Sequence, residues 1–162
     1  MTKAAISDIL CRPMKSVDLE RVLLLKVTEA QLPFVGTTAE MMAGENEGRE
    51  YHLIEYLGRV VGIFNVDLHY PQQFEFCPSN CLGLRGLLVD ASVQGLGVGS
   101  NAIKTFPDYL RSNYGSFDAV YLTVNCKNEI AHHCYDQGGF KDTGELYHGG
   151  TAGPQHIMCL SL

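Results

Sequence analysis

The apolar positions along the chain change their period repeatedly, which predicts alternating strands and helices. Runs that are alternately or continuously apolar, and that end at Gly, Pro or polar residues, are typical of strands. Apolar residues three and four positions apart are typical of helices. Strands are predicted at 6–12, 50–57, 60–70, 81–89, 118–124, 140–146 and 155–160, and helices at 17–27, at 39–43, after Gly99 and at 128–137.

Glycines and prolines mark the ends of these elements. Gly58 and Arg59 predict the turn of a β-hairpin, and the pair at 138–139 closes the last helix. Pro107 should kink or end the helix that follows Gly99, and 71–81 is predicted as a loop. The resulting order, β-α-α-β-β-β-α-β-α-β-β, indicates an α+β fold in which helices cover a mixed sheet.

Length and composition favour an ordinary globular protein. The chain has 162 residues, of which 46% are apolar and 19% charged, so we expect one domain over 1–162 and exclude intrinsic disorder. No apolar run approaches the roughly 18 residues of a membrane span, and the first residues lack a signal-peptide pattern. We therefore expect a cytoplasmic protein without a membrane partner.

The charge argues against a nucleic-acid partner, and the spacing of the cysteines and histidines makes zinc binding the less favoured alternative. A net charge of −6 and the lack of a basic cluster argue against a nucleic-acid partner. The six cysteines are expected to stay reduced. A zinc site would need two spaced ligand pairs, and Cys77 with Cys81 or the contiguous His132, His133 and Cys134 match that pattern poorly. We assign no metal.

The strongest local signal is a glycine-rich turn between a strand and a helix. The strand that ends Leu87-Leu88-Val89 is followed at 94–99 by Q-x-x-G-x-G. Glycines let backbone N–H groups approach a ligand, and a helix start adds unpaired donors and a positive dipole end. The spacing fits neither the P-loop nor the dinucleotide fingerprint. A simple turn would not need three alternating glycines, so we predict a phosphate or pyrophosphate site.

A second motif follows the glycine turn, and the two together resemble one family. Asn128 begins N-x-x-A-x-x-x-Y-x-x-x-G-F, which runs through Tyr135 to Phe140. Together with the glycine turn about thirty residues earlier, this resembles the GNAT superfamily of acetyl-CoA-dependent N-acetyltransferases. The resemblance implies a mostly antiparallel central sheet with helices on both faces, and acetyl-CoA as the acyl donor.

The resemblance also implies roles for individual residues. The pyrophosphate of CoA would be held by the backbone of the glycine turn, and the pantetheine arm by the strand before it, with contacts from two asparagines. Tyr135 would protonate the leaving thiolate. The implied cofactor residues are Leu87, Leu88, Val89, Gln94, Gly95, Leu96, Gly97, Val98, Gly99, Ser100, Asn125 and Asn128.

The general base and the acceptor stay open. Strand 81–87 lacks the glutamate that some members use, and Glu29, Asp67 and His69 are candidates of which none is assigned. The segment around Glu29, Gln31 and Phe34 is similar to spermine/spermidine acetyltransferase-like members, so Glu29 would bind a polyamine ammonium group. The alternatives are another small amine, a peptide amine, or a non-catalytic acyl-CoA sensor. A homodimer is expected from the family.

Overall fold

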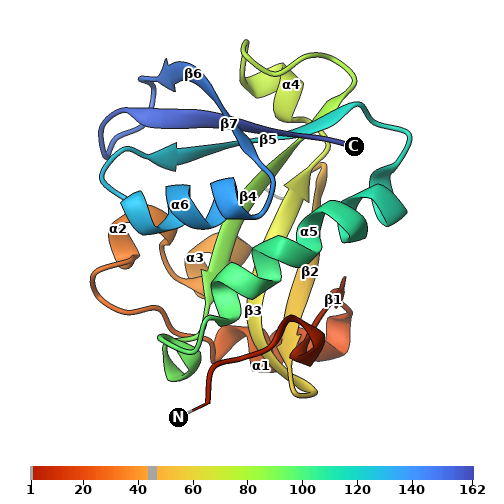
Figure 1. The fold of residues 1–162 in the computed structure, drawn as a ribbon, viewed down its shortest axis with the longest axis vertical. Coiled ribbons are helices and arrows are strands. Elements are labelled where there is room, and N and C mark those ends of the chain that lie inside the picture. Colours follow the sequence, from red (N-terminus) through yellow and green to blue (C-terminus); the bar gives the residue numbers. More distant parts are fainter. Residues whose placement is uncertain (1, 44–46) are drawn as a thin grey trace.

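The chain folds into a seven-stranded sheet with helices on both faces (Figure 1). The structure is a computed structural model, and it describes residues 2–43 and 47–162. The strands are β1 Ile9–Pro13, β2 Arg49–Tyr56, β3 Arg59–Asp67, β4 Cys81–Val89, β5 Ala119–Asn125, β6 Lys141–Tyr147 and β7 Gln155–Ser161. The α-helices are α1 Leu19–Leu23, α2 Leu32–Val35, α3 Thr38–Ala43, α4 Tyr70–Gln73, α5 Val98–Tyr114 and α6 Glu129–Gln137. Short 3₁₀ helices occur at η1 Ile6–Asp8, η2 Ser16–Asp18 and η3 Ala91–Val93.

The sheet opens in its middle. The strand order is β1-β2-β3-β4-β5-β7-β6, and every neighbouring pair is antiparallel except β4 and β5. That parallel pair is short, because only 81–83 of β4 and 119–121 of β5 are in register. The remainder of β4 has a partner on one side only, β3, and its other edge is open from Leu84 to Val89.

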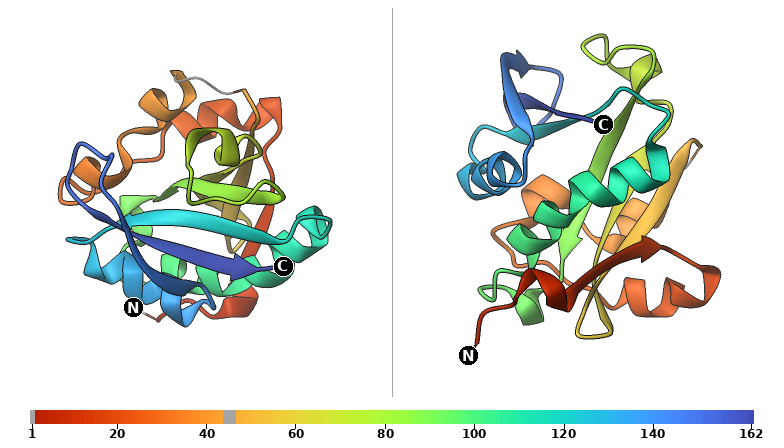
Figure 2. Two further views of the ribbon diagram at one scale, coloured as in Figure 1. Left: turned by 90° about the horizontal axis from the view of Figure 1, so that it is seen from above. Right: turned by 45° about the vertical axis from the view of Figure 1, so that its right-hand side comes forward.

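The described residues form three apolar clusters, and the two largest of them lie on opposite faces of the sheet. The larger packs Ile103, Phe106 and Leu110 of α5 against the inner face of the strands. The smaller packs Val22 and Leu25 on the other face. Figure 2 shows α5 and α6 on one side of the sheet and the orange segments with α2 and α3 on the other. The predicted α+β class with helices on both faces is confirmed.

The predicted helix at 17–27 is wrong in its second half, where tertiary contacts override the local pattern. Helical structure ends at Leu23. Lys26 instead lies beside the turn after β4, because its N–H donates to the carboxylate of Asp90 at 2.8 Å and its carbonyl accepts from Ala91 at 2.6 Å. The predicted first strand begins at Ile9 rather than residue 6, since η1 takes the preceding residues.

Pro107 does not end its helix. α5 continues through it to Tyr114. The carbonyl of Ile103, which loses its helical partner because proline has no N–H, faces Gly138, where an added Cβ would lie 3.1 Å from that oxygen. The end of α6 therefore packs against the carbonyl of Ile103, at the point where Pro107 removes a hydrogen bond from α5. The predicted loop at 71–81 also contains the short helix α4.

A buried histidine joins β2 to α5. His52 is 3% exposed, with Nδ1 2.6 Å from the hydroxyl of Tyr109 and Nε2 2.7 Å from that of Tyr114. Tyr114 donates to Glu50 at 2.7 Å, so its oxygen is free to accept from His52. All three hydrogen bonds have a donor and an acceptor when His52 is neutral, with its proton on Nε2 and with Tyr109 donating to Nδ1. Burial lowers the pKa of His52 to about 4.

We expect His52 to make stability depend on pH. The unfolded state binds this proton below about pH 6.5, whereas the folded state binds it only near pH 4, so folding stability falls as pH falls through this window. The wild-type free energy of unfolding should drop by on the order of 3 kcal/mol more than that of His52→Gln, which cannot titrate. Urea unfolding from pH 7 to pH 4 measures this, and parallel curves for the two proteins would contradict it.

Candidate functional site

The opening between β4 and β5 is a cavity of about 660 Å³. Its walls come from the open edge of β4, the glycine turn, α6, the segment around α2 and the loop between β6 and β7. No helix in the described part of the chain is long and apolar enough to cross a membrane. The sequence-predicted residues that line the cavity are Leu87, Val89, Gln94, Gly95, Gly97, Val98, Gly99, Ser100, Asn125, Asn128 and Tyr135.

The glycine turn presents unpaired N–H groups to the cavity. Gly95 and Gly97 have φ of +82° and +81°, values that favour glycine, and α5 begins at Val98. The first amides of a helix have no partner within it, so those of 98–100 are available. Two of the predicted donors are already used, because Gln94 N–H donates to Ala91 and Leu96 N–H donates to Val93. Leu96 also lies outside the cavity lining.

The open edge of β4 offers main-chain groups to an extended ligand. The N–H of Asp90 donates to Val61 of β3, so the carbonyl of Val89 in the same peptide unit points away from β3. It accepts from the Gln94 side chain at 3.1 Å. Because backbone groups alternate along a strand, Leu87 faces the open side too. Leu88 does not: it is 1% exposed, and its side chain packs in the smaller core.

Two asparagines fix the rim of the cavity. Asn125 donates to Ala152 at 2.9 Å and accepts from the N–H of Lys127 at 2.9 Å, which ties the loop between β6 and β7 to the end of β5. Asn128 caps α6 by accepting from Ala131 at 3.3 Å. The Asn125 side chain is thus occupied by the protein, whereas the amide NH₂ of Asn128 has no partner among the described residues.

Tyr135 reaches the cavity from α6. The residue is 7% exposed, and its ring meets Phe140 edge to face at 5.5 Å. Burial raises the pKa of the phenol above its ordinary value, so Tyr135 keeps its proton at neutral pH. Its hydroxyl bonds to none of the described residues, which leaves it free to donate to a bound molecule.

The floor of the cavity contains residues that the sequence analysis missed. The ring of Tyr70 lies on Gly83, where an added Cβ would be 1.9 Å from it, and its hydroxyl reaches Thr123 of β5. Arg85 lies over this ring at 4.9 Å and pairs with buried Asp67 at 2.8 Å. Gly83 was the one signal of this floor in the sequence, because a glycine inside a strand often marks a place where another group approaches the backbone closely.

None of the three candidate bases lines the cavity. Glu29 is exposed in the turn before α2. Asp67 is 0% exposed and holds Arg85, and its other oxygen accepts from the N–H of His69 at 2.9 Å. The described lining contains no Asp, Glu or His side chain, and Arg85 is its only charged group.

The arrangement can hold a long anionic molecule and give it a proton. Amides at the helix start suit phosphate oxygens, the open strand edge suits an extended amide-bearing arm, and Tyr135 suits a leaving group that gains a proton. These three features lie along one cavity.

Comparison with known proteins places the chain in a family. The profile of the Acetyltransferase (GNAT) family matches residues 16–140, so the chain belongs to this family. The resemblance found in the sequence, and with it the enzyme class of acetyltransferase, is confirmed. A search of curated proteins found no match.

Solved structures share the fold at low identity. Aminoglycoside acetyltransferase AAC(6')-Ib, in complex with paromomycin and acetyl-CoA, has 18% identity and a TM-score of 0.74, with coverage of 95% of this chain and 93% of that one. Spermidine N-acetyltransferase from Vibrio cholerae, in complex with CoA and spermine, has 16% identity and a TM-score of 0.68, with 96% of both chains covered.

We expect Gly83→Ala to disturb the cavity floor. The new methyl group would overlap the Tyr70 ring, so the variant should lose about 1–3 kcal/mol of stability. In a Tyr70→Leu background the same substitution should cost clearly less, because the ring is gone. Chemical unfolding of the two single variants, the double variant and the wild type measures the difference. Equal costs in both backgrounds would show that the ring does not occupy this space.

Proposed function

We propose that the protein transfers an acetyl group from acetyl-CoA directly to a primary amine of a small molecule or peptide, with Tyr135 as proton donor to the leaving thiolate. The observation that carries this proposal is the single cavity that joins the helix start, the open edge of β4 and the Tyr135 hydroxyl. Acetyl-CoA supplies an activated thioester.

The residues present fit acetyl-CoA. Amides of Gly95 and of 97–100 converge at the start of α5, where a pyrophosphate would meet both donors and the helix dipole. The backbone of Leu87 and Val89 would pair with the amides of the pantetheine arm, as an added strand does. The Asn128 amide faces the same cavity from α6. The Leu88 and Leu96 side chains have no part in this binding.

Tyr135 suits the departure of the thiolate. A thiol ordinarily has a pKa near 8.5, so a thiolate released inside a protein is a strong enough base to need a nearby proton. The raised pKa of Tyr135 keeps its proton available until that moment. The phenol then hydrogen-bonds to the developing negative charge, and its proton moves from oxygen to sulfur as the carbon–sulfur bond breaks. The proton that the acylated nitrogen loses restores the phenol, so the step balances.

The cavity favours a weakly basic acceptor amine. The described lining has no carboxylate or imidazole to remove a proton from an ammonium group. At pH 7 about one in ten α-amino groups is neutral, against about one in 2,500 lysine amines, because their pKa values differ. An acceptor with an α-amino group therefore needs no protein base, which makes it the preferred class.

Polyamines are the second candidate. The similarity of the segment around Glu29 to spermine/spermidine acetyltransferase-like enzymes, and the fold shared with a spermidine acetyltransferase, favour them. Against them, Glu29 is exposed outside the cavity, and the described walls offer a polycation no negative charge. The acceptor assay below decides between the two classes.

We expect Tyr135→Phe to lower kcat by about 10²–10⁴-fold, the usual contribution of a general acid. Binding of acetyl-CoA should be unchanged, because the hydroxyl acts only as the thiolate leaves. The matched control is Tyr56→Phe, which removes a phenol hydroxyl outside the cavity. Release of free CoA measures turnover, and calorimetric titration measures binding. A Tyr135→Phe enzyme as fast as the control would remove this residue from the mechanism.

The acceptor assay compares one short peptide in two forms. The first has a free α-amine and no lysine, and the second has a blocked N-terminus and one lysine. Spermidine, spermine and putrescine complete the panel. We expect the highest kcat/KM at pH 7 for the free α-amine. If only the polyamines are turned over, the α-amine class is wrong and polyamines are the acceptors. If acetyl-CoA binds and no amine is turned over, the protein is better explained as an acyl-CoA sensor.

The pH profile tests whether the protein supplies a base. With none, kcat/KM for a lysine amine should rise about tenfold per pH unit between pH 7 and pH 9, in step with the neutral amine. A plateau in that range would mean that a protein group removes the proton.

A further inference from the structure

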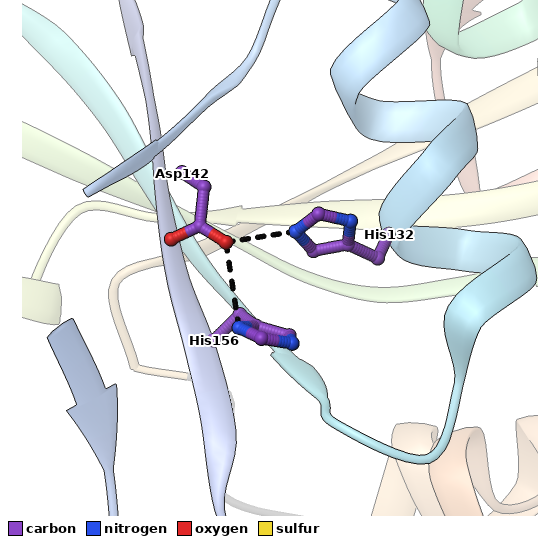
Figure 3. A group of neighbouring side chains, drawn as sticks. All are labelled: His132, Asp142 and His156. Carbon is purple, nitrogen blue, oxygen red and sulfur yellow. Dashed lines mark hydrogen bonds and ion pairs between the residues drawn. The ribbon is translucent and has the colours of Figure 1, made fainter. Parts of the chain in front are cut away.

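Three side chains from three elements converge at the side of α6 that faces the last hairpin (Figure 3). His132 of α6 places Nε2 2.8 Å from Oδ2 of Asp142 on β6, and His156 of β7 places Nδ1 3.4 Å from the same oxygen. The imidazole rings lie 4.6 Å apart. One atom from each side chain thus falls within 4.8 Å of the other two.

An irregularity in β6 aims the carboxylate at the two rings. The register between β6 and β7 shifts between Asp142 and Leu146, so the residues between them form a bulge. The hydroxyl of Thr143 holds the bulge by donating to Ile157 at 2.9 Å. The N–H of Gly144 donates to Oδ1 of Asp142 at 2.8 Å, which leaves Oδ2 for the imidazoles. Bulges commonly redirect a side chain in this way.

The donor set selects a class of ion. Two imidazole nitrogens and one carboxylate oxygen suit zinc and similar divalent transition metals, whereas Mg²⁺ and Ca²⁺ prefer oxygen ligands alone. In a tetrahedral zinc site, two such ligand atoms lie about 3.3 Å apart, close to the separations from Oδ2. The Gly144 N–H and His132 lower the pKa of Asp142, so the carboxylate is ionised and ready to bind. The side chains are 30%, 32% and 31% exposed, so an ion has access from solvent.

The geometry points to a zinc-class metal site formed by His132, Asp142 and His156, separate from the acetyl-transfer cavity. The ion takes one nitrogen from each ring and Oδ2 of the carboxylate, and water completes its coordination. A neutral ring that now donates to Oδ2 binds the ion once its single proton has moved to the other ring nitrogen, with no net release, whereas a protonated ring loses one proton to solvent.

This site joins α6 to the hairpin of β6 and β7. His132 lies next to Ala131 and three residues before Tyr135, both of which line the acetyl-transfer cavity. His156 follows Gln155, another lining residue. A bound ion would therefore hold the two walls that contribute these residues at a fixed separation, although no ligand of the ion enters the cavity itself.

The test is calorimetric titration of tag-free, EDTA-treated protein with ZnCl₂ at pH 7.5. We expect one ion per chain. His132→Asn and His156→Gln should each weaken binding by about tenfold or more, since each removes a ligand. His133→Asn is the matched control, because His133 is the next residue on α6, is exposed and is not in the cluster. MgCl₂ should give no binding heat.

A thermal-shift series keeps the result interpretable if one variant folds poorly. Zinc should raise the Tm of the wild type and of His133→Asn clearly more than that of His132→Asn, His156→Gln and Asp142→Asn. Melting without metal shows whether each variant is folded. The proposal is wrong if the folded cluster variants bind zinc as tightly as the His133→Asn control, or if the wild type binds none.

Discussion

The end of pairing between β4 and β5 after Gly83 is the constraint on which the site depends. Beyond this residue β4 keeps β3 on one side, and the main-chain groups of its other edge are left without a strand. Tyr70 lies across the point of separation, with its ring on Gly83 and its hydroxyl at Thr123 of β5. Unpaired main-chain groups in a buried position are costly, so an open edge inside a protein calls for a partner. A ligand that can act as a strand provides one.

The two halves of the sheet supply different parts of the chemistry. The half from β1 to β4 carries the open edge and the glycine turn, and it rests on two apolar cores and on the buried chain of hydrogen bonds through His52. The half with β5, β7 and β6 carries α6, and therefore Asn128 and Tyr135. The short pairing at 81–83, the packing of α5 on α6, the larger apolar core and the Tyr70–Thr123 contact connect them. The relative placement of these halves thus sets the distance between the amides at the start of α5 and the hydroxyl of Tyr135.

The charges around the cavity explain why the base could not be found. Arg85 and Asp67 neutralise each other beside Tyr70, so the acid nearest the floor is committed to structure. The described lining itself contains no carboxylate or imidazole. A site of this composition offers an anion backbone amides, and its one charged side chain, Arg85, is already paired with Asp67. Under the proposed function, such a site leaves the loss of the ammonium proton to the acceptor amine itself, so the amine's own pKa becomes the criterion for choosing among substrates.

The sequence by itself determined the elements and the glycine turn, because strand and helix periods, helix caps and positive-φ glycines are local properties of the backbone. It also determined the family, through two motifs in fixed order. It failed where distant contacts decide. The hydrogen bonds of Lys26 at the turn after β4 accompany the early end of α1, and the Leu88 side chain packs in the smaller core rather than lining the cavity. The floor of Tyr70, Gly83 and Arg85 and the cluster of His132, Asp142 and His156 arise only in the tertiary structure. Their members come from separate elements, so no spacing in the sequence records that they meet.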